Sequence, residues 1–192
     1  MSSSSSLRRR ALLEAALACF AEHGIEATTI ALLREATGAS TGSLYHHFGS
    51  REGLLAALYL EGLRDFRQHK HVALAGASTL AEGVRAIVRA HVDWISANPT
   101  WADFLFRQRQ VIAGSGAETQ LADEQAEDAA FMAAWAQGLG GLPALPMPVL
   151  VSLVAGPVHE YARQWLGGRV AEAPSVWESV FVHAALKALD LA

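Results

Sequence analysis

Apolar residues recur three and four positions apart along almost the whole of this chain, and this spacing restricts it to a helical fold. Leu13, Leu17 and Phe20 set the pattern in the first predicted helix, over residues 8–23. We find no segment with the alternating apolar and polar residues of a half-buried strand. The sequence therefore predicts an all-α protein of about nine helices.

The ends of the predicted helices follow from glycine, proline and serine residues that stop or cap them. Ser40 and Ser50 are each placed to cap a helix, and Pro157 is expected to kink one. The further helices are predicted over residues 28–38, 40–47, from 50 onward, 79–97, 100–113, 117–139, 149–167 and 174–190. Ser2–Ser6 are expected to be a disordered lead-in, and residues 140–148 a loop.

The composition favours a folded chain with more apolar surface than the core of one subunit can bury. Of the 192 residues, 52% are hydrophobic, which excludes disorder as the main state, and only 18% are charged. A partner interface or an apolar cavity would account for apolar residues beyond those that the core of one subunit needs. The single cysteine, Cys19, cannot form an internal disulfide and is expected to be a small buried residue.

Charge and hydropathy point to the cytoplasm and, weakly, to a polyanion partner. The net charge is −4, but residues 1–51 hold five arginines against four glutamates, whereas the rest of the chain is acidic. No signal-peptide core follows Arg8, Arg9 and Arg10, and no apolar run is long enough to span a membrane. No Cys/His spacing suggests zinc, and we expect no cofactor or metal.

Residues 28–51, TTIALLREATGASTGSLYHHFGSR, have the layout of a helix-turn-helix. In that motif the second helix enters the DNA major groove with its N-terminal residues on base edges. Thr41 and Ser43 are short enough to let the backbone approach DNA closely, while Tyr45 and His46 can reach phosphates. His47 could equally contact DNA or support the residues that do. Leu44 and Phe48 are predicted core.

Residues 38–54, GASTGSLYHHFGSREGL, with the preceding residues 24–29, GIEATT, resemble the tetracycline-repressor (TetR) family of transcriptional regulators. The resemblance covers roughly residues 8–60. It implies a three-helix DNA-binding domain over residues 1–50 and a helical effector-binding and dimerisation domain over residues 51–192. It also implies that DNA is contacted by Thr29, Ser40, Thr41, Ser43, Tyr45, His46 and Arg51.

One position departs from the family pattern. Arg34 stands where the family usually has a small residue packed beneath the third helix, and it is predicted to fall near the buried face of the second helix. Either its side chain extends outward to phosphate or solvent, or the helix is slightly rotated.

Two apolar stripes in the second domain each contain one polar interruption, His91 in one and Gln108 in the other. A buried polar group without a partner costs about 1–3 kcal/mol, so each needs a protein partner, a water or a ligand. An apolar cavity with a few polar groups is the usual composition of a ligand site. The candidate ligand-binding residues are His91, Trp94, Phe104, Arg107, Gln108, Phe131 and Trp135. The alternatives are a satisfied core histidine, a glutamine at the solvent edge and a salt bridge from Arg107 to Asp103.

The last two helices suit a homodimer contact. The helix over residues 149–167 carries small side chains that allow close approach of another helix: Ala155, Gly156, Val158 and Ala162. The helix over residues 174–190 carries an apolar stripe: Trp177, Phe181, Ala184, Ala185 and Ala188. By resemblance, the two helices of each subunit form a four-helix contact and predict a near-palindromic operator. Burial within one subunit is the alternative.

The leading hypothesis is a homodimeric repressor released from its operator by a small, largely apolar molecule. The alternatives are a transcriptional activator or a helical adaptor without small-molecule control. An enzyme is not expected, because no catalytic motif stands in its required context. His159-Glu160 lacks the second histidine of a zinc helix, and His69 and His71 do not converge on one face.

Overall fold

The computed structural model describes residues 3–139, 141 and 145–191 of the chain. Within them it contains ten α-helices, two short 3-10 helices and no strand. The all-α prediction is confirmed. The helices group into two compact units, one formed by residues 1–62 and 100–121 and the other by residues 63–99 and 122–192. The long helix α4 (Arg51–Leu74) contributes its first half to one unit and its second half to the other.

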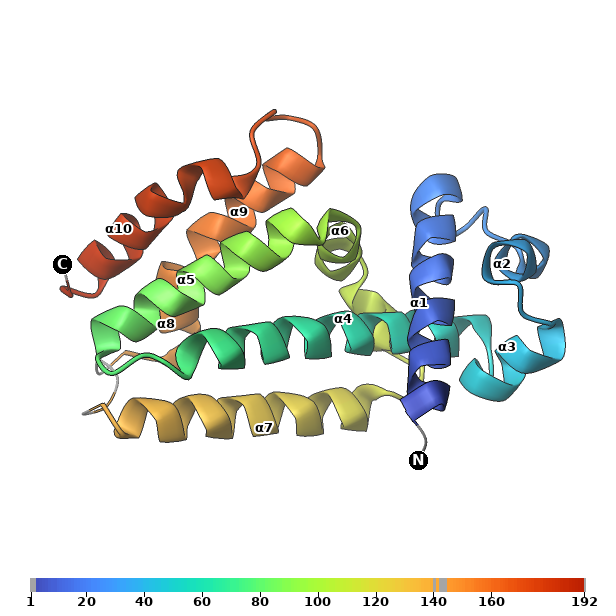
Figure 1. The fold of residues 1–192 in the computed structure, drawn as a ribbon, viewed down its shortest axis with the longest axis horizontal. Helices are drawn as coiled ribbons and strands as arrows, with labels where there is room; N and C mark the ends of the chain where they lie inside the picture. Colours follow the sequence, from blue (N-terminus) through green and yellow to red (C-terminus); the bar gives the residue numbers. More distant parts are fainter. Residues whose placement is uncertain (1–2, 140, 142–144, 192) are drawn as a thin grey trace. The chain divides into compact units, whose positions relative to one another are not determined.

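The first unit begins with α1 (Ser3–His23), α2 (Ile30–Thr37) and α3 (Thr41–Phe48), which Figure 1 shows beside the start of α4. Helix α1 starts at Ser3, so the described part of the serine run is helical rather than the expected disordered lead-in. Leu13, Leu33 and Leu58 are fully buried and bring α1, α2 and α4 onto one core. Each buried leucine contributes about 1.5–3 kcal/mol to stability.

The first unit is completed by α6 (Pro99–Arg107) and the 3-10 helix η1 (Arg109–Ile112), which replace the single helix predicted over 100–113. Gly62 of α4 allows close approach of α6, because a Cβ atom there would lie 2.8 Å from the Trp101 ring. The small residue therefore sets the packing of α6 on α4.

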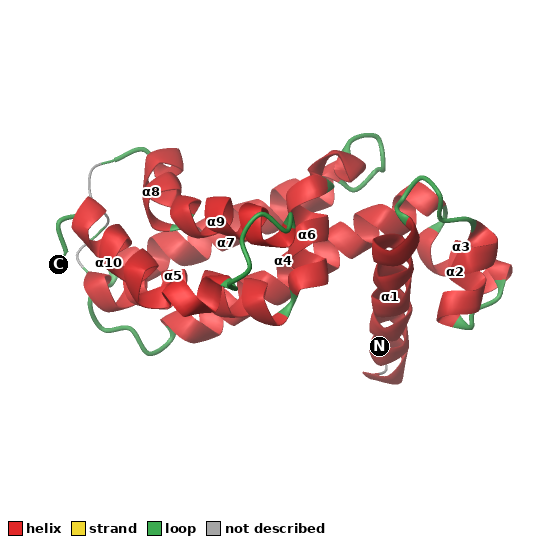
Figure 2. Ribbon diagram, turned by 90° about the horizontal axis from the view of Figure 1, so that it is seen from above, coloured by secondary structure: helices red, strands yellow, loops and turns green. Residues whose placement is uncertain are grey.

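The second unit is built around α5 (Leu80–Ala97), which packs against α8 (Met147–Val154), α9 (Gly156–Leu166) and α10 (Glu178–Ala188). Figure 2 shows these helices together with the second half of α4. A capping box between Thr79 and Glu82 fixes the start of α5, since the side chain of each accepts a hydrogen bond from the backbone N–H of the other. The unit also contains α7 (Glu118–Gln137) and the 3-10 helix η2 (Pro174–Trp177).

The helix predicted over 149–167 is divided at Ala155 into α8 and α9. Pro157 lies in the first turn of α9, where its missing N–H needs no intrahelical partner. The sequence prediction of a kink therefore understated the effect, because the proline begins a new helix.

Candidate DNA-binding surface and effector region

Helix α3 and its flanking turns are fixed by local hydrogen bonds. Gly38 ends α2 in the left-handed conformation, with φ 65°, which glycine adopts without steric cost. Ser40 then caps α3 by accepting the N–H of Ser43 over 3.1 Å, and Ser50 caps α4 by accepting the N–H of Gly53 over 3.0 Å. Both predicted serine caps are confirmed.

The buried side of α3 holds it to the unit. Leu44 and Phe48, one turn apart, are both buried, as the sequence predicted. Their burial turns the opposite side of α3 toward solvent. Tyr45 is 47% exposed, and His46 and His47 are exposed as well. The helix thus presents hydroxyl, imidazole and phenol groups outward from a rigid support.

All seven predicted DNA-contact residues are at least partly accessible, and Arg51 is half-buried. Thr29, Ser40, Tyr45 and His46 are exposed, while Thr41 and Ser43 are half-buried. Thr29 caps α2 by accepting the N–H of Leu32 over 3.3 Å. A capping hydroxyl still has its own proton to donate to a phosphate oxygen. The geometry is therefore compatible with these contacts.

Arg51 faces inward. Its Nη2 donates a hydrogen bond to the carbonyl oxygen of Ile25, and its Nε is buried. In contrast, Arg34 is exposed, although the sequence placed it near the buried face of α2. The buried residue of that helix is Leu33, and the side chain of Arg34 is exposed, which agrees with the first of the two alternatives, an outward-extending side chain.

Four of the seven candidate ligand residues lie in the second unit. His91 is buried, and its Nδ1 lies 2.7 Å from the carbonyl oxygen of Ile87. Trp94 is buried and donates a hydrogen bond from Nε1 to Asp65 Oδ2 over 2.8 Å. The Phe131 ring is 38% exposed and Trp135 is half-buried. His91 thus has the protein partner that the sequence required of a buried polar group.

The other three candidates lie in the first unit. Phe104 is buried, and Gln108 accepts a hydrogen bond from Gln110 over 2.9 Å. Arg107 is exposed and forms a salt bridge to Asp103, with 2.6 Å between Nε and Oδ1. The salt bridge from Arg107 to Asp103, predicted from the sequence as the alternative to a ligand contact, is therefore present. Ligand contact by these three residues stays a prediction.

The buried imidazole of His91 and the half-buried imidazole of His159 lie together in the second unit. The rings of His91 and His159 are 4.9 Å apart between centroids, and the ring of Phe66 packs on His91 at 4.6 Å. Burial, with the neighbouring His159, lowers the pKa of His91 to about 3. Burial and the charge of Arg163 lower the pKa of His159 to about 4. Both side chains are therefore neutral at physiological pH.

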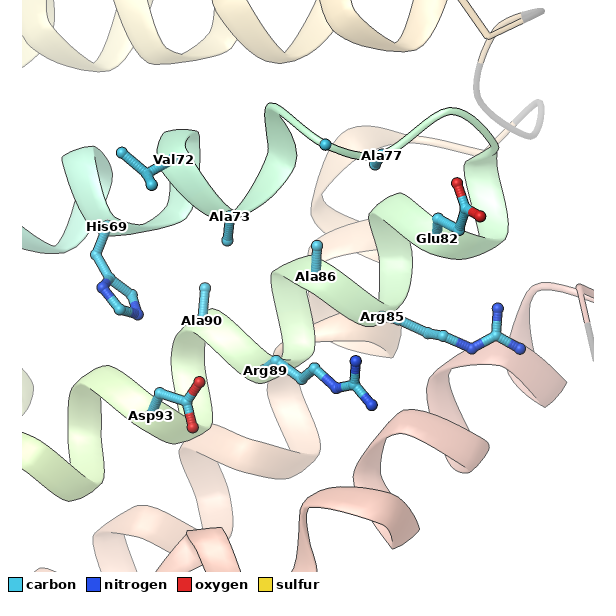
Figure 3. Close-up of a pocket in the computed structure, with 11 residues that line it drawn as sticks. His69, Val72, Ala73, Ala77, Glu82, Arg85, Ala86, Arg89, Ala90 and Asp93 are labelled. Carbon is cyan, nitrogen blue, oxygen red and sulfur yellow. The ribbon is translucent and has the colours of Figure 1, made fainter.

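Figure 3 shows an open groove between α4 and α5, with a volume of 530 Å³. Ala73 of α4 faces Ala86 and Ala90 of α5 across it, with His69 and Arg89 at its edges. None of the seven candidate ligand residues is among those that line it. Sequence reasoning missed this groove because alanines give no chemical signal.

The described residues hold no group of three or more histidine, cysteine, aspartate or glutamate side chains placed to bind a metal ion. Among residues 3–139, 141 and 145–191, no helix has both the length and the apolar character that crossing a membrane requires.

Comparison with known proteins relates the N-terminal region to DNA-binding regulators. Residues 12–58 match the family of bacterial regulatory proteins described as the tetR family. The chain is 53% identical over 53 residues to the HTH-type transcriptional repressor AcnR of Corynebacterium glutamicum, an alignment that covers 28% of each protein. The chain spans 28–46% of the length of the first relatives that it matches.

Solved structures show that the whole chain shares one fold with such regulators. A TetR family regulator from Marinobacter aquaeolei VT8 superposes with a TM-score of 0.77 at 21% identity, over 98% of both chains. The regulator FadR of Bacillus subtilis, solved in complex with stearoyl-CoA, has a TM-score of 0.71 at 14% identity, over 96% of this chain and 99% of that one. The match over residues 12–58 relates the helix-turn-helix part of this chain to the tetR family of bacterial regulatory proteins, and the solved structures show that the chain has the fold of such regulators.

Proposed function

We propose that this chain is a transcriptional repressor that binds operator DNA through α3. The observation that carries the proposal is the outward face of α3, where Tyr45 and His46 are exposed while Leu44 and Phe48 anchor the helix. Such a helix, rigidly held and rich in short hydrogen-bonding side chains, suits insertion into a major groove. Thr29, Ser40, Thr41 and Ser43 supply further hydroxyl groups.

The proposed repressor is a homodimer. The end of the chain exposes a row of apolar side chains on η2 and α10, including Val176, Trp177 and Val180, which are 42–60% exposed. Exposed apolar residues on one surface commonly mark a protein interface. A two-fold dimer would present two copies of α3 to successive turns of one face of the duplex. The proposed contact surface is the last two helices, with the exposed apolar side chains coming from η2 and α10, because Val158 and Ala162 of α9 are buried within the subunit.

The proposed effector is a small, largely apolar molecule. FadR of Bacillus subtilis, which shares the fold, was solved in complex with stearoyl-CoA, and this supports a small-molecule effector for this chain. His91, Trp94, Phe131 and Trp135 are the proposed ligand-facing residues of the second unit. Phe104, Arg107 and Gln108 lie in the first unit, and ligand contact by them is proposed from the sequence alone. A ligand releases DNA only if it binds the two conformations with different affinity.

The test is selection of DNA from a random-sequence pool by the purified full-length protein. We expect enrichment of a near-palindromic sequence, bound more weakly when stearoyl-CoA is added as a first probe. A pool that remains random after repeated selection would refute DNA recognition. A selected operator with no sensitivity to stearoyl-CoA would leave repression standing and exclude that probe as effector.

A further inference from the structure

Some arginines of the DNA-binding region form ion pairs or hydrogen bonds within the described part of the protein, and others do not. Arg9 forms a salt bridge to Glu61, with 3.4 Å between Nη1 and Oε2, and lies over the Phe48 ring at 5.8 Å. Arg10 pairs with Glu14 over 3.0 Å. In both cases a carboxylate already compensates the charge, so these residues offer less attraction to a phosphate.

Arg51 is engaged most deeply. Its hydrogen bond to the Ile25 carbonyl joins the start of α4 to the turn after α1, while its buried Nε has no hydrogen-bond partner within the described residues and the residue as a whole is half-buried. Turning this side chain to DNA would leave the Ile25 carbonyl without that donor. Its position therefore indicates a structural clamp rather than a DNA contact.

Arg34 and Arg8 are exposed, and neither forms an ion pair or a side-chain hydrogen bond within the described residues. Arg34 lies on the helix-turn-helix itself. It lines an open groove of 450 Å³ with Ala31, Glu35, Gly38, Ala39 and Ser40. Ala31, Gly38 and Ala39 are small, so they leave the guanidinium accessible beside the capping residue of α3. Glu35 is the opposing charge in the groove.

We infer that Arg34 binds a DNA backbone phosphate beside the inserted helix α3, and that Arg51 does not contact DNA. The inference rests on the proposed function. It replaces Arg51 with Arg34 among the DNA-contact residues that the family resemblance implies. A guanidinium offers a planar pair of donors that matches two phosphate oxygens. Because α3 begins seven residues after Arg34, a phosphate held there fixes the register of α3 in the groove.

The test measures how DNA affinity depends on salt, with the full-length protein and a labelled duplex that the wild type selects from a random pool. Each phosphate contact contributes a slope of about −0.9 to the plot of log affinity against log salt. Arg34→Gln should reduce the magnitude of that slope by about 1 per subunit, and Arg34→Lys should restore most of it. Glu35→Gln should tighten binding.

The matched control is Arg51→Gln, which removes one arginine from the same unit. It should lower the unfolding midpoint and leave the salt slope of the folded protein unchanged. A normal slope for Arg34→Gln, or a reduced slope for Arg51→Gln alone, would overturn the assignment while DNA binding by the wild type stands. Absence of any duplex binding by the wild type would overturn the proposed function as well.

Discussion

The indole ring of Trp135 lies directly against the backbone of Gly83. A Cβ atom at Gly83 would come within 2.0 Å of Cζ2 and 2.1 Å of Cη2 of that ring. Gly83 is in the first turn of α5 and Trp135 is near the end of α7, so the missing side chain creates the space into which the ring fits. This contact attaches the end of α7 to α5.

Replacing Gly83 with alanine should therefore destabilise the protein. Overpacking of this kind costs about 1–3 kcal/mol, which outweighs the gain of about 0.5–1 kcal/mol that alanine brings to a helix. Urea unfolding at fixed protein concentration would measure the difference. The control is Gly42→Ala, where the nearest side-chain atom is 3.9 Å away, and its unfolding midpoint should rise or stay the same. A stabilised Gly83→Ala would contradict the packing described.

Asp128 is one of two acidic residues that attach α7 to α4, the other being Glu124, which binds Arg64 and Arg67. The two carboxylate oxygens of Asp128 lie 2.8 and 2.7 Å from Lys70 Nζ, and His71 Nε2 lies 2.7 Å from Oδ1. Burial opposes its ionisation, but the hydrogen bonds and charge of Lys70, with His71, outweigh burial and lower the pKa of Asp128. Asp128→Ala leaves the largely buried Lys70 ammonium without its partner, at a cost of about 1–3 kcal/mol.

Hydrogen exchange should show which helix loses stability when Asp128 is replaced with alanine. Ala136 is the one residue of α7 classed as buried, so this helix depends on its polar contacts more than α5 does. In Asp128→Ala the amides of α7 should exchange faster while those of α5 keep their protection. Lys70→Met combined with Asp128→Leu should recover much of the stability. Equal loss in both helices would indicate global unfolding instead.

Features of the fold that depend on neighbours in sequence could be predicted, and those that depend on distant neighbours could not. Ser40, Ser50 and Gly38 act within one turn, so their residue types determine the caps. The partner of Arg51 is 26 residues away, and nothing in the sequence selects the Ile25 carbonyl over a phosphate. The same holds for His159, whose approach to His91 depends on how α9 packs on α5.

Stability should fall as the pH drops below about 6.5, because His91 and His159 are neutral when folded. Their folded pKa values, about 3 and about 4, lie below the unfolded value of 6.5. The unfolded chain therefore binds more protons in that window, and each histidine lowers the free energy of unfolding by at most about 1.4 kcal/mol per pH unit. Asp128 near His91 opposes the effect, while Lys70 and Arg163 strengthen it.

Urea unfolding between pH 7 and pH 4.5 would check this. His91→Leu should flatten the dependence, whereas the control Val88→Ala, which truncates a buried neighbour on α5, should lower stability equally at each pH. An unaltered pH dependence in His91→Leu would show that other groups govern acid sensitivity.

Tyr45→Phe and His46→Ala should weaken operator binding without destabilising the fold, since both side chains are exposed on α3. Loss of one hydrogen bond to a charged phosphate corresponds to about 1.5–3 kcal/mol, or at least a tenfold weaker affinity. A mobility-shift titration would measure it, with the exposed His23→Ala, outside the helix-turn-helix, as control. Unchanged affinity in both variants would exclude these two contacts.

Val180→Glu should convert the protein to a monomer. Val180 is 55% exposed on α10, beside the exposed Trp177, and a glutamate there would bring two carboxylates into an apolar two-fold contact. Sedimentation velocity would report the mass. Val72→Glu is the matched control, because Val72 is 70% exposed on α4, away from the last two helices, and its variant should keep the wild-type mass. A dimeric Val180→Glu with a monomeric Val72→Glu would move the interface to the α4 surface.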